Sequence, residues 1–146
     1  MKAKRSDLVV AFIGLGRMGS AMAARLVMPR TPEDVVSGKK SAKKSAGKTA
    51  KTSKKTAGGS SSGVSLRVWN RTAKRAEPFR KLGAFVASTP RECALGADIV
   101  VTMLADKDAL AEVMIGHDGL LSGLARGALV IDMSTIGRAG AVEASK

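Results

Sequence analysis

Short apolar runs alternate with amphipathic stretches along most of the chain, and this alternation predicts a series of strand and helix units. The runs are apolar along nearly their whole length instead of at every second residue. Such continuous runs are typical of strands in a parallel sheet that is covered on both faces. The pattern therefore predicts a single α/β domain with a doubly wound parallel sheet. Its strands are expected at Val9 to Ile13, Leu66 to Asn70, Ala84 to Ala87, Asp98 to Leu104 and Ala128 to Met133.

The stretches between these runs carry signals for helix ends. Apolar residues recur at helical spacing from Met18 to Leu26. Gly83 suits a C-terminal cap, Thr89 to Glu92 matches a capping box with proline at the first helical position, and Asp106 suits an N-cap. Pro78 lies too far along its stretch for the first turn of a helix that starts at the preceding strand, so we expect that helix to begin late or to kink.

The segment from Ser37 to Gly63 departs from the pattern. It consists almost wholly of Lys, Ser, Ala, Thr and Gly, and it holds eight lysines and no acidic residue. Like-charge repulsion and the lack of large apolar side chains predict a disordered loop at about 37–63, which interrupts a domain that spans 1–146. Much of the net charge of +13 lies in this loop, so the total charge says little about the folded part.

Composition limits the remaining possibilities. With 146 residues, of which 45% are hydrophobic, the chain has room for one core. The single Cys93 allows no intrachain disulfide and no cysteine cluster for zinc, which favours a reducing compartment and no metal site. The apolar run Leu8 to Leu15 is too short for a membrane helix, and Asp7 and Arg17 argue against a signal peptide. We expect a soluble cytoplasmic protein without a membrane partner, and the sequence leaves a nuclear or organellar location open.

The strongest chemical signal is a glycine motif. It follows the first apolar run and opens the first helical pattern, as Gly14-Leu15-Gly16-Arg17-Met18-Gly19. In this context the first glycine makes a tight turn, the second lets the backbone approach a pyrophosphate, and the third lets the helix pack close to the strand. The free N–H groups at the start of that helix favour a phosphate. The motif predicts a Rossmann-type dinucleotide site, with an ordinary glycine-rich turn as the alternative.

The residues after the second strand indicate which dinucleotide is bound. An NAD site usually has an acid at this position, where it holds the ribose 2′-hydroxyl. This chain has Asn70, Arg71 and Thr72 instead. An arginine suits a 2′-phosphate, and no carboxylate repels it. These residues favour NADP, with NAD as the second choice and a solvated Arg71 as the alternative interpretation.

Four blocks in this order resemble the β-hydroxyacid dehydrogenases, a family that includes 3-hydroxyisobutyrate, 6-phosphogluconate and glyoxylate/succinic semialdehyde enzymes. The blocks are Phe12 to Gly19 with Met22-Ala23, Val68 to Thr72, Met103 to Asp106, and Ile131 to Thr135. The resemblance is closest to the glyoxylate/succinic semialdehyde reductase branch. It implies the NADP-binding domain of an oxidoreductase that moves a hydride between NADP(H) and a small aldehyde or β-hydroxy acid.

The resemblance also implies roles for later residues. It gives Leu104 and Ala105 a backbone contact to the cofactor, places Thr135 near the nicotinamide, and places Ser134 near the carboxylate of a small-molecule substrate. The residues themselves show only that these positions follow strands, where an open parallel sheet binds ligands. A helix N-cap is the alternative role for Ser134 and Thr135.

No catalytic residue is predicted in this chain. The family's catalytic lysine belongs to a helical domain after the Rossmann half, and nothing here matches it, so we expect that domain to be absent and the chain alone to be inactive. His117, the single histidine, is predicted to be a loop residue and not a general base. The methionines Met103, Met114 and Met133 are predicted to fill the core and not to bind metal.

Two other interpretations stay open. In one, the chain is a chromatin-associated or nucleic-acid-binding protein that keeps the dehydrogenase fold as a scaffold, as in a nuclear member of the family. We expect any nucleic-acid binding through the basic loop to be weak, without sequence preference and strongly reduced by salt, whereas binding that persists at high salt would support this interpretation. In the other, the insert and the early C-terminus arise from an imperfect gene model.

Overall fold

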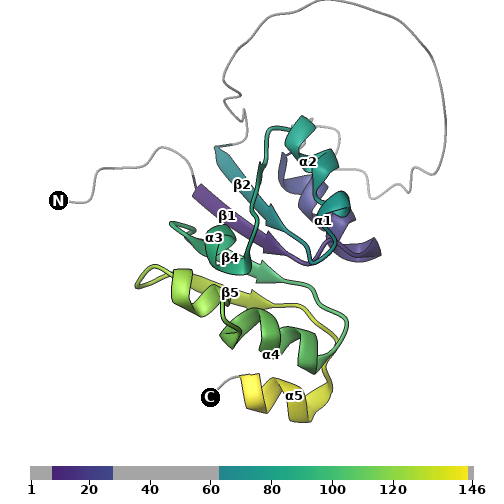
Figure 1. The fold of residues 1–146 in the computed structure, drawn as a ribbon, viewed down its shortest axis with the longest axis vertical. Helices are drawn as coiled ribbons and strands as arrows, with labels where there is room; N and C mark the ends of the chain where they lie inside the picture. The colour runs from purple at the N-terminus through teal and green to yellow at the C-terminus, as the bar shows by residue number, and fades with distance from the viewer. Residues whose placement is uncertain (1–7, 28–62, 145–146) are drawn as a thin grey trace, which may run out of the picture.

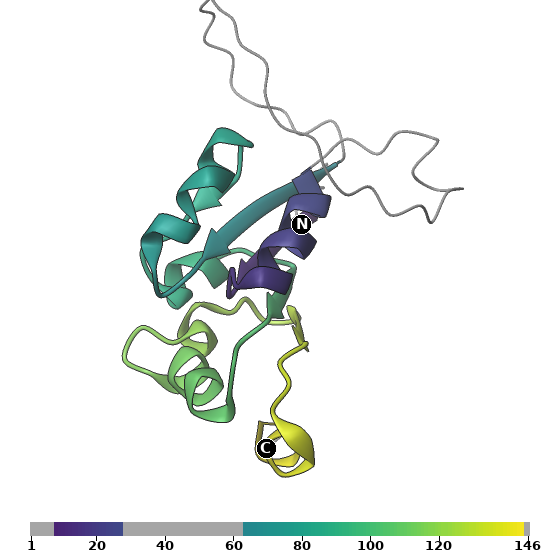
Figure 2. The ribbon, with the colours of Figure 1, turned by 90° about the vertical axis from the view of Figure 1, so that its right-hand side faces the viewer.

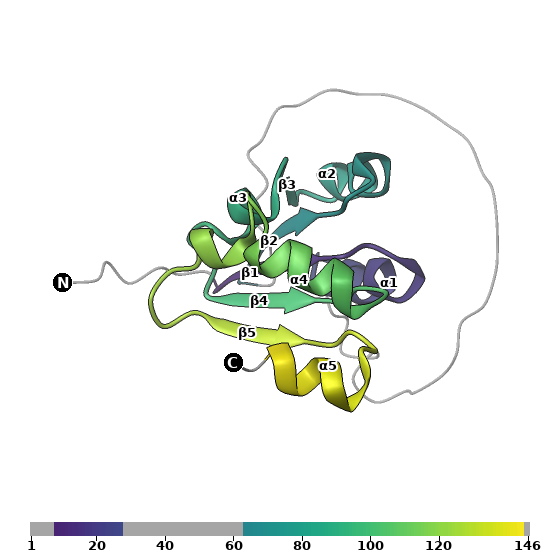
Figure 3. The same cartoon turned by 60° about the horizontal axis from the view of Figure 1, so that its bottom comes forward.

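The computed structural model describes residues 8–27 and 63–144, which form a five-stranded parallel sheet with helices on both faces (Figure 1). The strand order is β3-β2-β1-β4-β5, and Figure 3 shows β4 and β5 at one side of the sheet with α5 beyond them. The predicted α/β class and doubly wound sheet are confirmed. The strands are β1 (Leu8–Ile13), β2 (Val64–Trp69), β3 (Phe85–Val86), β4 (Ile99–Thr102) and β5 (Leu129–Asp132).

Helices connect the strands. In Figure 2, α5 lies at the end of the molecule opposite α2. The α-helices are α1 (Arg17–Val27), α2 (Glu77–Lys81), α3 (Pro90–Ala94), α4 (Lys107–Ile115) and α5 (Gly137–Ala144), and the short 3-10 helices are η2 (Ala73–Arg75) and η3 (Leu120–Gly123).

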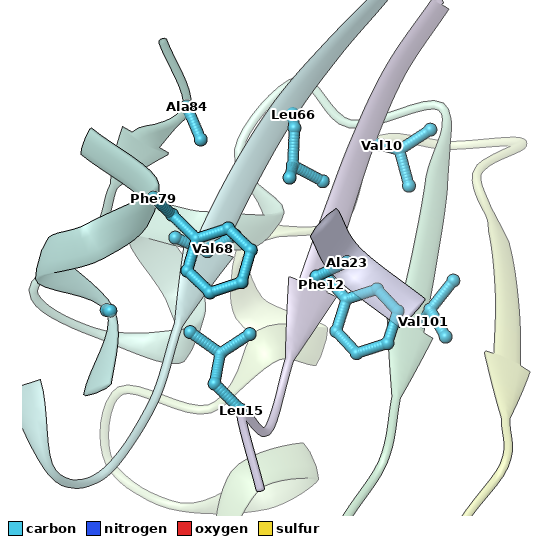
Figure 4. Packing of buried hydrophobic residues seen from close by; sticks show 10 residues of the cluster. Val10, Phe12, Leu15, Ala23, Leu66, Val68, Phe79, Ala84 and Val101 are labelled. Atoms are coloured by element: carbon cyan, nitrogen blue, oxygen red, sulfur yellow. The ribbon is translucent and has the colours of Figure 1, made fainter. Parts of the chain in front are cut away.

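One face of the sheet packs against α1 and α2. Phe12 and Val68 from the two central strands lie beside Leu15 from the glycine motif and Phe79 from α2 (Figure 4). Ala23 of α1 is fully buried in the same cluster. Because alternate residues of a strand point to opposite faces, these positions separate cleanly from those on the other side of the sheet.

The other face packs against α3, α4 and η3. Ala11, Ile13 and Val100 from the strands belong to one buried cluster with Cys93 of α3 and Leu120 of η3. Burial raises the pKa of the Cys93 thiol from 9.0 to about 12, and the positive charge of Arg67 offsets only part of this rise. Cys93 is therefore a packing residue in this core.

The predicted helix signals hold. Thr89 Oγ1 accepts a 3.1 Å hydrogen bond from the N–H of Glu92, and Asp106 Oδ1 accepts one of 2.8 Å from the N–H of Ala109. The helix that contains Pro78 does begin late, because η2 comes first and Pro78 falls in the first turn of α2. Among the methionines, Met103 and Met114 pack against the core as predicted.

The prediction for Met133 is wrong. Its side chain is 43% exposed, because it follows β5, which has β4 as its only neighbour in the described sheet. A residue that follows such an edge strand has few neighbours that could bury it.

The described chain breaks at the edge of the sheet where the strands begin. A helix that joins parallel strands runs back toward the start of the next strand, so α1 ends at this edge with Val27. The chain is described again from Gly63, whose carbonyl accepts a 2.9 Å hydrogen bond from the N–H of Leu8. Apart from Gly63, the predicted lysine-rich loop lies outside the described residues.

Candidate dinucleotide-binding site

A cavity of about 460 Å³ lies where β1, β2 and β4 end. Strand β1 is the point at which the strand order reverses, since β2 lies on one side of it and β4 on the other. An open α/β sheet binds ligands at such a point. The cavity is lined by Gly14, Gly16, Trp69, Asn70, Arg71, Thr72, Arg75, Pro90, Met103, Leu104, Ala105, Ala109, Glu112, Val113, His117 and Asp118.

The three glycines of the motif occupy three different environments. Gly14 has a φ of +98°, and a Cβ there would overlap the carbonyl of Met103. A Cβ on Gly19 would overlap the carbonyl of Gly14, whereas a Cβ on Gly16 would have no atom within 4 Å. The first glycine therefore makes the turn, the third permits close packing, and the second leaves open space in front of the backbone, where a pyrophosphate can approach.

Asn70 ties the glycine loop to the end of β2. Its Oδ1 accepts a 2.8 Å hydrogen bond from the backbone N–H of Leu15, and its Nδ2 donates one of 3.0 Å to the carbonyl of Thr72. The hydroxyl of Ser20 adds a 3.0 Å bond to the carbonyl of Leu15. The amide of Asn70 thus orients two loops that line the cavity, a role that the sequence did not indicate.

Two arginines lie on the β2 side of the cavity. Arg71 and Thr72 were predicted here, and η2 adds Arg75. Both arginines are exposed, and in the described part of the chain neither has an acidic side chain within ion-pair distance. They leave positive charge available to an anion in the cavity. Arg75 was missed, although it lies four residues after Arg71, a spacing that puts side chains on one side of a helical turn.

Helix α4 and the turn after it form the opposite wall. Ala109 and Val113 contribute apolar surface, and Glu112, His117 and Asp118 contribute polar groups. His117 follows α4 in a turn, as predicted for a loop residue, and its side chain is 98% exposed with Nδ1 3.3 Å from Asp118 Oδ2. This wall suits a flat ring with polar edges better than a phosphate.

Ser134 and Thr135 follow β5 and are not among the residues that line the cavity. The Ser134 hydroxyl donates a 2.6 Å hydrogen bond to Asp132 Oδ1 and accepts one of 2.9 Å from the N–H of Leu104. A substrate carboxylate would compete with Asp132 for that single proton. The residue directly before α5 is Ile136, so neither Ser134 nor Thr135 takes the N-cap position.

Two kinds of feature are absent from residues 8–27 and 63–144. No group of three or more His, Cys, Asp or Glu side chains is arranged to hold a metal ion there. No helix in these two ranges combines the length and the apolar character that crossing a membrane requires.

The family model for the NAD binding domain of 6-phosphogluconate dehydrogenase matches residues 56–146. The chain belongs to this family. A second model, NADP oxidoreductase coenzyme F420-dependent, matches residues 9–67 and so covers the glycine motif. The resemblance predicted from four sequence blocks is confirmed, and so is the dinucleotide-binding type of the domain.

Curated relatives of this NAD-binding domain are oxidoreductases. The uncharacterized oxidoreductase YfjR of Bacillus subtilis is 51% identical over 74 residues, which are 51% of this chain and 26% of YfjR. The 3-sulfolactaldehyde reductase of Escherichia coli is 32% identical over 87% of this chain and 32% of its own length. The chloroplastic glyoxylate/succinic semialdehyde reductase 2 of Arabidopsis thaliana is 28% identical over 94% of this chain and 29% of its own.

Solved structures of dehydrogenases and reductases share the fold of this domain. An imine reductase from Myxococcus stipitatus in complex with NADP+ aligns with a TM-score of 0.63 and 27% identity, over 95% of this chain and 35% of that one. The 3-hydroxyisobutyrate dehydrogenase of Mycobacterium tuberculosis with L-serine aligns with a TM-score of 0.64 over 94% of this chain and 35% of that one. At 24% identity, the second match supports the fold alone.

The NAD-binding domain spans about a third or less of these relatives. The alternative of nucleic-acid binding gains no support from them. The basic segment on which that alternative depends lies outside the residues that the structure describes.

Proposed function

We propose that this domain binds NADP in preference to NAD, as the cofactor-binding part of an oxidoreductase that acts on a small aldehyde or β-hydroxy acid. The observation that carries the proposal is the composition of the cavity at the end of β2. Asn70, Arg71, Thr72 and Arg75 line it, and no carboxylate stands where an NAD site holds the ribose 2′-hydroxyl. The arginines would meet the 2′-phosphate that distinguishes NADP from NAD.

The other walls of the cavity fit the rest of the dinucleotide. The open space at Gly16 and the first turn of α1, with Arg17, Met18 and Gly19, would receive the pyrophosphate. The apolar surface of Ala109 and Val113 would contact the adenine ring. Leu104 and Ala105, at the end of β4, would support the middle of the cofactor.

The reacting end would lie toward β5. The bound cofactor would supply the hydride. We propose that Thr135 lies near the nicotinamide and that Ser134 meets the substrate carboxylate, which would draw the hydroxyl proton of Ser134 away from Asp132. The 3-sulfolactaldehyde reductase and glyoxylate/succinic semialdehyde reductase among the relatives support a small aldehyde that carries an acidic group as the substrate class.

A titration of both cofactors tests the preference for NADP. NADPH and NADH are titrated into the 146-residue chain, into Arg71→Ala and into Arg75→Ala, with binding followed by calorimetry. Loss of the charged pair to the 2′-phosphate should cost Arg71→Ala ~1.5 to 3 kcal/mol of NADPH binding, with little change for NADH.

Arg126→Ala is the matched control. Arg126 is also an exposed arginine, but it lies before β5 and does not line the cavity, so its loss should leave both affinities unchanged. Equal affinity of the parent chain for the two cofactors, or an unchanged ratio in Arg71→Ala, would overturn the proposed preference.

A further inference from the structure

One carboxylate oxygen, Asp132 Oδ1, accepts three hydrogen bonds at the end of β5. The donors are the hydroxyl of Thr102 at 2.7 Å, the hydroxyl of Ser134 at 2.6 Å and the backbone N–H of Ser134 at 3.1 Å. Thr102 is fully buried and faces Asp132 across the β4–β5 pairing. A carboxylate accepts several hydrogen bonds more readily than a neutral group does, so Asp132 suits this position.

The bond to Asp132 decides which way the Ser134 hydroxyl points. A serine hydroxyl has one proton to donate, and here that proton goes to Asp132. The oxygen is left as an acceptor, and it accepts the 2.9 Å hydrogen bond from the backbone N–H of Leu104. Without the Asp132 carboxylate, the Ser134 hydroxyl could rotate and would no longer keep its oxygen directed toward the Leu104 N–H.

The hydrogen bond from the Leu104 N–H to the Ser134 hydroxyl joins two loops that are distant in sequence. Leu104 belongs to the loop after β4 and lines the cavity. Ser134 belongs to the loop after β5, 30 residues later. One is proposed to contact the cofactor and the other the substrate, so this bond connects the two halves of the proposed site.

We infer that Asp132 is a positioning residue, which holds Ser134 and, through the Ser134 hydroxyl, fixes the cofactor-facing backbone of Leu104. This inference rests on the proposed function for its consequence in cofactor binding. The fixing of the Leu104 amide by Ser134 and Asp132 can be measured without any cofactor.

The chain offers a matched control at the opposite edge of the sheet. Asp98 precedes β4 and accepts a 2.9 Å hydrogen bond from the backbone N–H of Val9 through Oδ2. It is also an aspartate that fixes the end of a strand, and it does not line the cavity. Asp98→Ala therefore reports the cost of losing such an aspartate away from the site.

The first measurement is hydrogen exchange at the Leu104 amide in the unliganded chain. Exchange should accelerate by at least about tenfold in Asp132→Ala and in Ser134→Ala, because the amide loses its acceptor or the acceptor loses its orientation. Asp132→Asn, which keeps an acceptor oxygen, should exchange at an intermediate rate. Asp98→Ala should leave this amide unchanged.

The second measurement compares two ligands. NADPH affinity should fall by about tenfold in Asp132→Ala and Ser134→Ala, and the double variant should lose no more than either single one, because both changes break the same connection. Adenosine 2′,5′-bisphosphate carries the 2′-phosphate that Arg71, Thr72 and Arg75 would meet, and its affinity should fall by less than about twofold. A general loss of stability would weaken both ligands equally.

Four results would overturn the inference. These are unchanged exchange at Leu104, equal losses for NADPH and adenosine 2′,5′-bisphosphate, additive losses in the double variant, and the same effects in Asp98→Ala. If the parent chain binds neither NADPH nor NADH, the proposed function fails instead, and exchange at Leu104 alone decides whether Asp132 holds the loop.

Discussion

The side-chain Oδ1 of Asn70 accepts a 2.8 Å hydrogen bond from the backbone N–H of Leu15. Leu15 is 1% exposed, so its N–H has no access to bulk water and depends on this acceptor. A buried N–H without a partner costs ~1 to 3 kcal/mol. Asn70 is therefore both a neutral residue beside the proposed phosphate site and a structural support of the glycine loop.

Replacing Asn70 with aspartate should shift the cofactor preference without unfolding the loop. The Asp side chain keeps an acceptor for the Leu15 N–H and loses only the donor to the exposed Thr72 carbonyl. Its negative charge repels a 2′-phosphate and suits a ribose 2′-hydroxyl. We expect the ratio of NADPH to NADH affinity to fall by about tenfold, equivalent to ~1.4 kcal/mol. Titration of both cofactors into Asn70→Asp measures it, and an unchanged ratio would show that position 70 does not face the 2′ substituent.

Asn70→Ala separates the two roles of the residue. This variant removes the acceptor without adding charge, so thermal unfolding should show a loss of stability of ~1 to 3 kcal/mol. NADPH and NADH should weaken together, because the glycine loop serves both. A selective loss of NADPH in Asn70→Ala would contradict this division of roles.

The glycines at positions 16 and 19 should respond oppositely to alanine. A Cβ on Gly16 meets no atom within 4 Å, so Gly16→Ala should keep the melting temperature of the parent and lose NADPH affinity by more than about tenfold. A Cβ on Gly19 overlaps the backbone carbonyl of Gly14, so Gly19→Ala should destabilise the domain by ~1 to 3 kcal/mol. Calorimetric unfolding and NADPH titration of both variants test the pair. Full NADPH affinity in Gly16→Ala would contradict a pyrophosphate at that position.

Cys93 should be unreactive in the folded chain. Burial raises the pKa of its thiol to about 12, and the thiolate is the reactive form. Iodoacetamide should modify Cys93 slowly under native conditions and rapidly in denaturant. Rapid labelling of the folded chain would show that α3 does not pack as described.

The same pKa shift predicts a dependence of stability on pH. Above a pH of about 9.0 the unfolded thiol loses its proton, while the folded thiol keeps it up to about 12. The Cys93 contribution is therefore complete below pH 9, and the free energy of unfolding falls as the pH rises from 9 to 12. Cys93→Ala should lose stability less steeply over this interval than the parent chain.

The 146-residue chain should bind NADPH and yet reduce glyoxylate and succinic semialdehyde at a rate close to background. No lysine is among the residues that line the cavity, and the proton of the Ser134 hydroxyl is donated to Asp132. A positioned acid or base contributes ~10² to 10⁴ in rate. Absorbance at the NADPH band measures turnover, and calorimetry on the same sample confirms binding. Turnover on the order of 1 s⁻¹ or faster would contradict the prediction and direct mutagenesis to His117, Lys107 and Ser134.

Local sequence predicted the features that depend on neighbouring residues. The glycine motif, the Thr89 and Asp106 caps and the late start of α2 at Pro78 each follow from a few adjacent side chains, and each is found. The apolar runs predicted all five strands, because a strand covered on both faces must be apolar throughout.

Contacts between distant segments could not be predicted in this way. Asn70 and Leu15 are 55 residues apart, and nothing in either segment indicates that one side chain reaches the other backbone. The engagement of Ser134 by Asp132 and Leu104 depends on the β4–β5 pairing. Met133 was misjudged for a related reason, since its exposure depends on what lies beside an edge strand and not on its own type.

Helix α1 ends with Val27, and Gly63 precedes β2, at the edge of the sheet where the strands begin. This position matters for insertions and deletions in the domain. The glycine motif and the segments that directly follow β2 and β4, which line the cavity, lie at the other edge. We therefore expect that residues added or removed between Val27 and Gly63 leave the spacing of Asn70, Arg71 and the glycine motif unchanged. A fluorescent reporter inserted between Val27 and Gly63 should therefore leave cofactor recognition intact.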